Sequence, residues 1–268
     1  MPPVLSCYAA LMDAIPVGAQ LRVWRQRRRL SQMALSLEAG VSQRHLSCVE
    51  SGRVSPSREM VLRLAEQLEV PLRDCNALLL AAGYAPCFAD RPLTDPAVSA
   101  VLRAMLAAHG ANPALAVDRH WQMVEANAAV APLLAGVSEP SLLRPPINVL
   151  RLSLHPGGLA PRIGNLAEWR AHILARLRRQ VAASGDAQLS VLAQELARLG
   201  GPFPETAHAV TPGIAVPLLL DGPAGRLALI STTTVFGTPL EVSLSELAIE
   251  AFYPADAETA ARLRALQA

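Results

Sequence analysis

The sequence predicts two domains, a compact all-α domain of five helices followed by a mixed α/β domain. Three observations support this prediction. The 268 residues exceed the length of one typical domain, short helical patterns fill the first third of the chain, and strand patterns alternate with longer helices after a proline-rich break. Hydrophobic residues make up 51% of the chain and charged residues 17%, a composition that excludes a disordered protein.

The all-α domain is expected at residues 17–84, after an N-terminal extension at 1–16. Ser31, Ser42 and Ser57 are good N-caps, and Gly40 suits the left-handed conformation that ends a helix. The predicted helices begin near Leu21 and then cover 32–39, 43–50, 58–68 and 71–82. Residues 85–96 contain three prolines and are expected to form the linker.

Charge is concentrated in this first domain. All 24 basic residues are arginine, and between Val17 and Met60 eight arginines face three acidic residues. The rest of the chain carries more acidic residues than arginines. A basic segment on a faintly acidic body predicts a polyanionic partner for that segment.

The segment 30–53 reads Leu30-Ser-Gln-x-x-Leu35, Ala39-Gly-Val-Ser42 and Leu46-Ser-x-Val49-Glu50-x-Gly52-Arg53. Leu46 and Val49 would anchor the helix after Ser42 and leave its polar side chains outside, in a form that fits the DNA major groove. There Arg44 would pair with guanine and Gln43 with adenine, and flanking residues would hold phosphates. The predicted DNA-binding residues are Gln32, Ser42, Gln43, Arg44, His45, Ser47 and Arg53.

On these motifs, residues 17–82 resemble a lambda-repressor-like helix-turn-helix of the XRE (xenobiotic-response-element) family. The resemblance implies double-stranded DNA as partner and binding as a homodimer to paired half-sites. It also implies that an Arg of the first helix pairs with the Glu that ends the third, here Arg25 and Glu50. The alternative is a plain helix bundle in which Arg22 and Arg27–Arg29 form a solvated face.

The α/β domain is expected at 97–268. Residues 115–117, 122–125, 214–220 and 226–232 are the expected strands, and 235–236 and 240–244 are expected to continue the sheet around a turn at 237–239. The expected helices are 97–109, 127–134, 166–183, 187–199, 246–252 and 256–265. Residues 140–161 are rich in proline and glycine, with one short apolar run.

This domain resembles the MmyB-like ligand-binding domain. The resemblance is carried by Asn112–Trp121 with Ala126-Asn127-Ala128, Asn148–Pro156, Leu166–Arg170, Thr232–Pro239 and Glu250–Asp256. It implies a PAS-like fold with a pocket for a small molecule or fatty acid. Because lambda-repressor-like domains usually act as dimers, this second domain is also expected to hold the dimer.

Composition supports a pocket independently of the resemblance, because small aliphatic residues around a curved sheet leave room for an apolar ligand. The candidate lining residues are Trp121, His155, Trp169, Arg170 and Phe236. Three of them have a structural alternative: Trp121 as part of the core, His155 as the cap of a turn, and Arg170 as a surface charge.

Catalytic and metal motifs are absent from the sequence. It contains no GxSxG, GxGxxG, P-loop or HExxH pattern, its six histidines are dispersed, and its four cysteines form no CxxC pair. We therefore expect no enzyme and no metal, but a cytoplasmic, nucleoid-associated regulator that senses a small apolar molecule such as a fatty acid. The alternatives are a PAS-like protein that binds haem through His120 or His155 or scaffolds a partner, and a hydrolase that depends on His155.

Overall fold

The computed structural model describes residues 15–199, 216–237 and 240–267. The predicted extension as far as residue 14, the first two residues of the predicted strand 214–220 and turn residues 238–239 lie outside the described residues. The chain forms two compact units. The first ends at Arg91 and also includes the segment 240–245, and the second holds Pro92–Gly237 and the chain from Glu246 onward. Among the described residues, no helix has the length and apolar character needed to span a bilayer.

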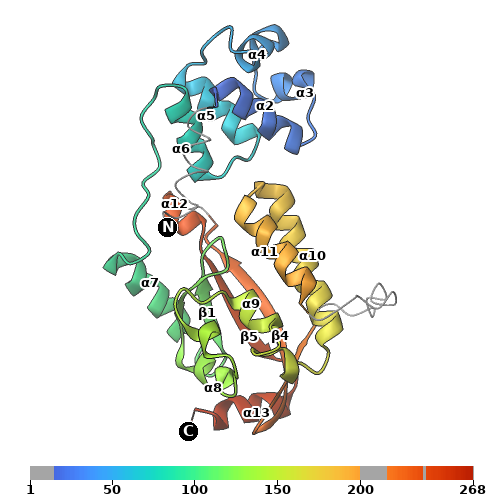
Figure 1. Cartoon of the computed structure of the whole chain (residues 1–268). Coiled ribbons are helices and arrows are strands. Elements are labelled where there is room, and N and C mark those ends of the chain that lie inside the picture. The colour runs from blue at the N-terminus through green and yellow to red at the C-terminus, as the bar shows by residue number, and fades with distance from the viewer. Residues whose placement is uncertain (1–14, 200–215, 238–239, 268) are drawn as a thin grey trace. The chain divides into compact units, whose positions relative to one another are not determined.

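The first unit is the predicted all-α domain (Figure 1). Its helices are α2 (Val17–Arg27), α3 (Gln32–Glu38), α4 (Gln43–Glu50), α5 (Arg58–Gln67) and α6 (Leu72–Ala81). The hydroxyl oxygens of Ser31, Ser42 and Ser57 each accept a hydrogen bond from the backbone N–H three residues later, at 3.0–3.2 Å. One apolar cluster joins the helices and includes Leu21, Trp24, Leu35, Leu46, Val49, Leu64 and Leu78.

Helices α2 and α4 approach each other closely at Gly18. A Cβ atom on Gly18 would lie 2.0 Å from the carbonyl oxygen of Val49 and 2.9 Å from its carbonyl carbon. These are backbone atoms, which cannot move aside as a flexible side chain can. Glycine at this position therefore permits the contact that fixes α4 against α2.

The segment 240–245 belongs to the first unit and contains a short helix, so the prediction that 240–244 continues the sheet is wrong. This helix is α12 (Val242–Ser245) and it packs against α6. The Val242 N–H donates to the Ala89 carbonyl at 2.8 Å, and the Ser243 hydroxyl donates to the Arg91 carbonyl. Arg91 also pairs with Glu241 at 3.1 Å. The hydrogen bonds of this segment, with an isolated parallel bridge between Glu241 and Ala89, therefore go to residues 89–91 and not to the five-stranded sheet.

The second unit contains an antiparallel five-stranded sheet in the order β2-β1-β5-β4-β3. Its strands are β1 (Ala114–Val117), β2 (Met123–Ala126), β3 (Leu218–Gly222), β4 (Gly225–Val235) and β5 (Ala248–Pro254). The prediction of a helix at 246–252 is wrong, because β5 is the central strand. Local helix propensity favoured a helix there, but pairing with both β1 and β4 outweighs it.

The main layer of helices covers one face of the sheet, and the opposite face is partly exposed at Ile230 and Tyr253, which pair across β4 and β5. On one face lie α8 (Ala131–Leu134), α9 (Val149–Leu154), α10 (Leu166–Ser184) and α11 (Ala187–Arg198), which share an apolar core with the strands. Helix α7 (Pro96–Ala107) packs against β1 and β2, and α13 (Ala257–Ala265) packs against β4 and β5. Helix α9 was not predicted within the proline-rich stretch, and there the Asn148 side chain caps it by accepting from the Arg151 N–H at 3.0 Å.

We predict that Gly18→Ala destabilises the protein by about 3 kcal/mol, the upper end for overpacking, because the new Cβ meets immobile backbone. Helix propensity alone would favour alanine by about 1 kcal/mol, so a loss identifies the helix contact as its cause. The measurement is chemical denaturation followed by circular dichroism. The control Gln26→Ala, at an exposed position of the same helix, should change stability by less than about 0.5 kcal/mol. An unchanged or raised stability of Gly18→Ala would contradict the argument.

Candidate DNA interface and ligand cavity

Helix α4 presents polar side chains on one side and is anchored by apolar side chains on the other. Leu46 and Val49 are each 1% exposed, whereas Gln43, Arg44 and Ser47 are exposed. This placement leaves amide, guanidinium and hydroxyl groups available to base edges in a major groove. Arg53, just beyond the helix, is also exposed, and His45 is half-buried.

Two residues of the predicted DNA-binding set have structural contacts of their own. The Ser42 hydroxyl caps α4 by accepting from the His45 N–H at 3.2 Å. The Gln32 amide nitrogen donates to Glu50 Oε2 at 2.9 Å, which fixes the start of α3 to the end of α4. These contacts position the two helices, and Gln32 keeps its carbonyl oxygen for other partners.

Arg25 and Glu50 form a two-point ion pair between α2 and the end of α4. Arg25 Nε lies 2.6 Å from Glu50 Oε1 and Nη2 lies 2.8 Å from Oε2, and Nη1 donates to the Leu30 carbonyl at 2.8 Å. Burial by itself would raise the pKa of the Glu50 carboxyl, but hydrogen bonds from Arg25 and Gln32 and nearby positive charge lower this pKa below its ordinary value of 4.5. The pair therefore stabilises the ionised form of Glu50.

Two arginines of the cluster at 27–29 make contacts within the helical unit. Arg28 Nε donates to the Leu68 carbonyl at 2.7 Å, and Nη2 donates to the Glu69 carbonyl at 2.8 Å. Because these carbonyls lie at the C-terminal end of α5, Arg28 satisfies acceptors that the helix leaves open. The Arg27 guanidinium lies 4.8 Å from the centre of the Trp24 ring. Arg27 and Arg28 are thus more than a solvated face.

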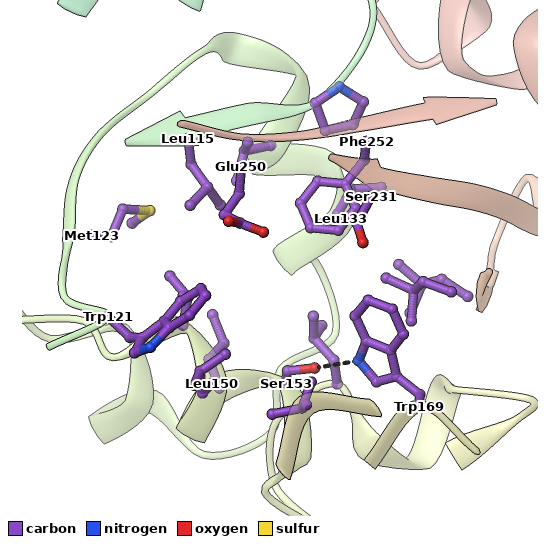
Figure 2. Close-up of a pocket in the computed structure, with 18 of the residues that line it drawn as sticks. Leu115, Trp121, Met123, Leu133, Leu150, Ser153, Trp169, Ser231, Glu250 and Phe252 are labelled. Atoms are coloured by element: carbon purple, nitrogen blue, oxygen red, sulfur yellow. Dashed lines mark hydrogen bonds between the residues drawn. The ribbon is translucent and has the colours of Figure 1, made fainter. Parts of the chain in front are cut away.

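The second unit encloses a cavity of about 100 Å³ between the sheet and helices α8, α9 and α10 (Figure 2). Strands contribute Leu115, Met123, Leu218, Leu220, Ser231, Glu250 and Phe252 to its wall. Helices contribute Val130, Leu133, Leu134, Val149, Leu150, Leu152, Ser153, Trp169, His172, Ile173 and Arg176, and loops contribute Pro113, Trp121 and Leu159. Most of this wall is aliphatic or aromatic, as in sites for apolar molecules.

Two of the predicted ligand residues, Trp121 and Trp169, line this cavity. Their indole nitrogens are occupied, since Trp121 Nε1 donates to Gln180 Oε1 at 2.8 Å and Trp169 Nε1 donates to Ser153 Oγ at 3.0 Å. Both tryptophans are buried and turn apolar ring surface toward the cavity, as Figure 2 shows. Their rings are therefore available for apolar contact.

The other three predicted ligand residues, His155, Arg170 and Phe236, do not line this cavity. His155 Nδ1 accepts from the Gly157 N–H at 3.0 Å, which makes it the cap of a turn. Arg170 is buried on α10 and donates to the Ala197 carbonyl of α11 at 2.5 Å. Phe236 follows the last residue of β4. His120, the other haem candidate, also lies outside the wall, and its Nε2 is 2.8 Å from Asp186 Oδ2.

The cavity also contains charged residues that sequence reasoning missed, Arg176 and Glu250. Arg176 Nη2 lies 2.7 Å from Glu250 Oε1, and Nη1 lies 3.0 Å from Oε2. The Arg176 guanidinium also lies 4.4 Å from the centre of the Trp121 ring. Glu250 was missed because a helix, and not a strand of the sheet, was expected at 246–252. The available signal was the strand-forming pair Phe252-Tyr253 directly before Pro254.

His172 is the third ionisable residue of the described wall. Its ring stacks on Trp169, with 5.6 Å between the ring centres. Burial lowers the pKa of the His172 imidazole below its ordinary value of 6.5, and the positive charges of Arg176 and Arg179 lower it further, against smaller opposing effects of Glu250 and Glu168. The imidazole is therefore neutral at pH 7.

We predict that Glu50→Gln lowers stability at neutral pH and flattens its dependence on acid. Because the folded-state pKa of Glu50 is depressed, its stabilisation is present above the ordinary value of 4.5 and is lost as pH falls through the lower folded-state value. The measurement is denaturant unfolding between pH 7 and pH 3, and the expected loss at pH 7 is about 3 kcal/mol, since Arg25 loses its charged partner. As control, Glu38→Gln, at an exposed position of α3, should keep the wild-type pH profile. Parallel profiles for Glu50→Gln and wild type would overturn the assignment.

Two protein-family models match the chain, one in each unit. The model of the MmyB-like transcription regulator ligand binding domain matches residues 98–266, more than half of the chain, and a helix-turn-helix domain model matches residues 16–78. The search of curated proteins finds no match to the chain. The helical unit with its exposed α4 and the α/β unit with its apolar cavity thus lie where the two models match. The chain belongs to the MmyB-like family of transcription regulators, in which a helix-turn-helix domain precedes a ligand-binding domain.

Proposed function

We propose that this regulator binds a specific operator sequence through α4 as a homodimer, and that a small apolar molecule in the cavity changes its affinity for the operator. The observation that carries the proposal is the exposure of Gln43, Arg44 and Ser47 on a helix whose other side is buried. In a helix-turn-helix domain, such a helix enters the major groove and its side chains contact base edges.

The DNA contacts we propose divide by chemistry. Arg44 and Gln43 suit bidentate pairing with guanine and adenine, each worth roughly 1–3 kcal/mol of discrimination. Ser47 and His45 lie on the same helix, and Gln32, Ser42 and Arg53 flank it and suit phosphate contacts. Lambda-repressor-like domains act on paired half-sites, which supports a homodimer.

The ligand we propose is small and largely apolar, with fatty acids as one candidate class. Support comes from the aliphatic and aromatic wall and from a cavity of about 100 Å³. For comparison, an engineered apolar cavity of about 150 Å³ stays dry and binds benzene. The strand order 2-1-5-4-3 supports a PAS-like fold for this unit.

The path of the chain offers a route by which the cavity influences the helical unit. Strands β4 and β5 contribute Ser231 and Glu250 to the cavity wall, and the connection between them contains α12, which packs in the first unit. A ligand that shifts these strands would therefore act on α12 through the covalent chain. It changes DNA affinity only if it binds two conformational states with different affinity.

We predict that Arg44→Ala lowers affinity for an operator fragment about tenfold, through loss of one bidentate base contact, and leaves thermal stability unchanged. Arg25→Ala should lower stability as well, because Arg25 pairs with Glu50 inside the fold. The measurement is a gel-shift titration against genomic fragments at moderate salt, paired with thermal melts.

The charge-matched control is Arg264→Ala, at an exposed position of α13. It should keep the affinity of the wild-type protein. Equal affinity of the wild-type protein for all fragments would contradict sequence-specific binding, and an unchanged Arg44→Ala would remove this residue from the interface.

We predict that Ser243→Ala reduces the effect of a bound ligand on operator affinity without changing ligand binding. The substitution removes the hydrogen bond from Ser243 to the Arg91 carbonyl that helps to hold α12 in the first unit. With 1-octanol as the probe, calorimetry measures its binding and gel shifts measure its effect on the operator. Thr234→Ala, at an exposed position of β4, is the control. A full ligand response in Ser243→Ala would exclude this route.

A further inference from the structure

Glu250 places an ionisable acid in the wall of a largely apolar cavity. It lies on the central strand β5 and is 5% exposed. Successive side chains of a strand point to opposite faces, so Glu250 and Phe252 share the cavity face. Figure 2 shows the Glu250 carboxylate directed into the cavity, between Leu115 and Phe252 and on the side facing Trp121 and Trp169. Any occupant of the cavity meets this carboxylate.

Arg176 already neutralises Glu250. Its two bonds to the carboxylate, at 2.7 Å and 3.0 Å, use the planar geometry in which guanidinium and carboxylate pair most strongly. Arg176 is held further by Thr233, whose Oγ1 accepts from Nη2 at 2.7 Å, and by the face of Trp121. These contacts use three of the five N–H groups of Arg176 and pair its charge with Glu250, so a ligand carboxylate would have to compete with Glu250 for it.

The charges of the described wall therefore sum to zero. Arg176 and Glu250 cancel, and His172, whose pKa is lowered by burial and by neighbouring arginines, is neutral at pH 7. A ligand carboxylate would enter a neutral cavity beside an existing carboxylate, and like charges that share a buried site repel strongly. The ligand carboxylate would also lose its hydration, and the one cation of the described wall, Arg176, is already paired with Glu250 and would not compensate for that loss.

A neutral donor group fits the same place. An ionised carboxylate offers about four acceptor sites, and Arg176 takes one on each oxygen, so Glu250 can still accept a hydrogen bond from a ligand. The hydroxyls of Ser153 and Ser231 also lie in the wall. An ammonium head group would instead add a positive charge next to Arg176.

On these grounds we infer that the cavity selects an apolar molecule with a neutral, hydrogen-bond-donating head group, such as an alkyl alcohol, over the matching carboxylate or amine, and that Glu250 sets this preference. The inference rests on the proposed function of the cavity as a ligand site. It narrows the ligand class, because a free fatty acid becomes a poor occupant.

The first experiment uses the full chain without substitution. Isothermal titration calorimetry at pH 7.5 compares 1-octanol, octanoate and octylamine, which share one chain length and differ in head-group charge. We expect octanol to bind at least about tenfold more tightly than either ion, because a single unpaired charge in a partly buried site costs more than about 1.4 kcal/mol. Tryptophan fluorescence gives a second readout, because two of the three tryptophans, Trp121 and Trp169, line the cavity.

The second experiment changes the net charge of the cavity wall from zero to positive. Glu250→Gln keeps the shape of the side chain and leaves Arg176 without its carboxylate, so octanoate should gain at least about tenfold in affinity while octanol changes little. The control is Glu195→Gln, which removes a carboxylate from a more exposed two-point pair with Arg151, at 2.6 Å and 2.7 Å, away from the cavity wall. It should keep the wild-type preference.

The outcomes distinguish the inferred head-group preference from the proposed role of the cavity as a ligand site. Octanoate binding to the wild-type protein as tightly as octanol, or an unchanged preference in a folded Glu250→Gln protein, would overturn the inference and leave the ligand site standing. Failure of all three compounds to bind would count against the ligand site itself. Should Glu250→Gln fail to fold, the comparison of head groups on the wild-type protein still decides the question.

Discussion

The position of β5 in the middle of the sheet is the constraint on which the ligand-binding unit depends. A strand paired on both sides has its backbone hydrogen-bonded to two neighbours, and its side chains alternate between the two faces of the sheet. Ile249 and Ala251 are buried on one face, while Glu250 and Phe252 point into the cavity on the other. An acidic residue in such a strand needs a partner, and Arg176 of α10 supplies it. The presence of an ion pair in the cavity wall thus follows from the place of β5 in the sheet.

The helical unit depends on a different kind of contact. Gly18 lets α2 approach the backbone of α4, and the Arg25–Glu50 pair fixes the end of α4 against α2. The two contacts act at neighbouring residues of α4, so this end of the helix is held at two points while Gln43 and Arg44 stay exposed at the other. A helix held in place before binding reduces the ordering cost of association. A buried ion pair adds little net stability, which makes geometry its main contribution here.

The segment between β4 and β5 connects the sheet of the second unit to the helical unit. Its helix α12 belongs to the helical unit by its hydrogen bonds to Ala89 and Arg91, although both flanking strands belong to the sheet. Residues 87–91 are also held in the first unit, because Asn76 accepts from Cys87 and Phe88, and Arg73 pairs with Asp90. The chain therefore passes between the units at Arg91 and again on either side of α12.

The sequence by itself determined the features that depend on neighbouring residues. N-caps, a left-handed glycine and 3.6-residue periodicity gave the bounds of α3 and α4 within a residue, and the motif around Ser42 gave the exposed polar set of α4. Trp121 and Trp169 were also proposed for the cavity from sequence. Only the tertiary structure decided the fate of 240–244 and 246–252, because distant partners, residues 89–91 for one and β1 and β4 for the other, outweigh local propensity. The same long-range pairing placed Glu250 in the cavity and kept His155, Arg170 and Phe236 out of it.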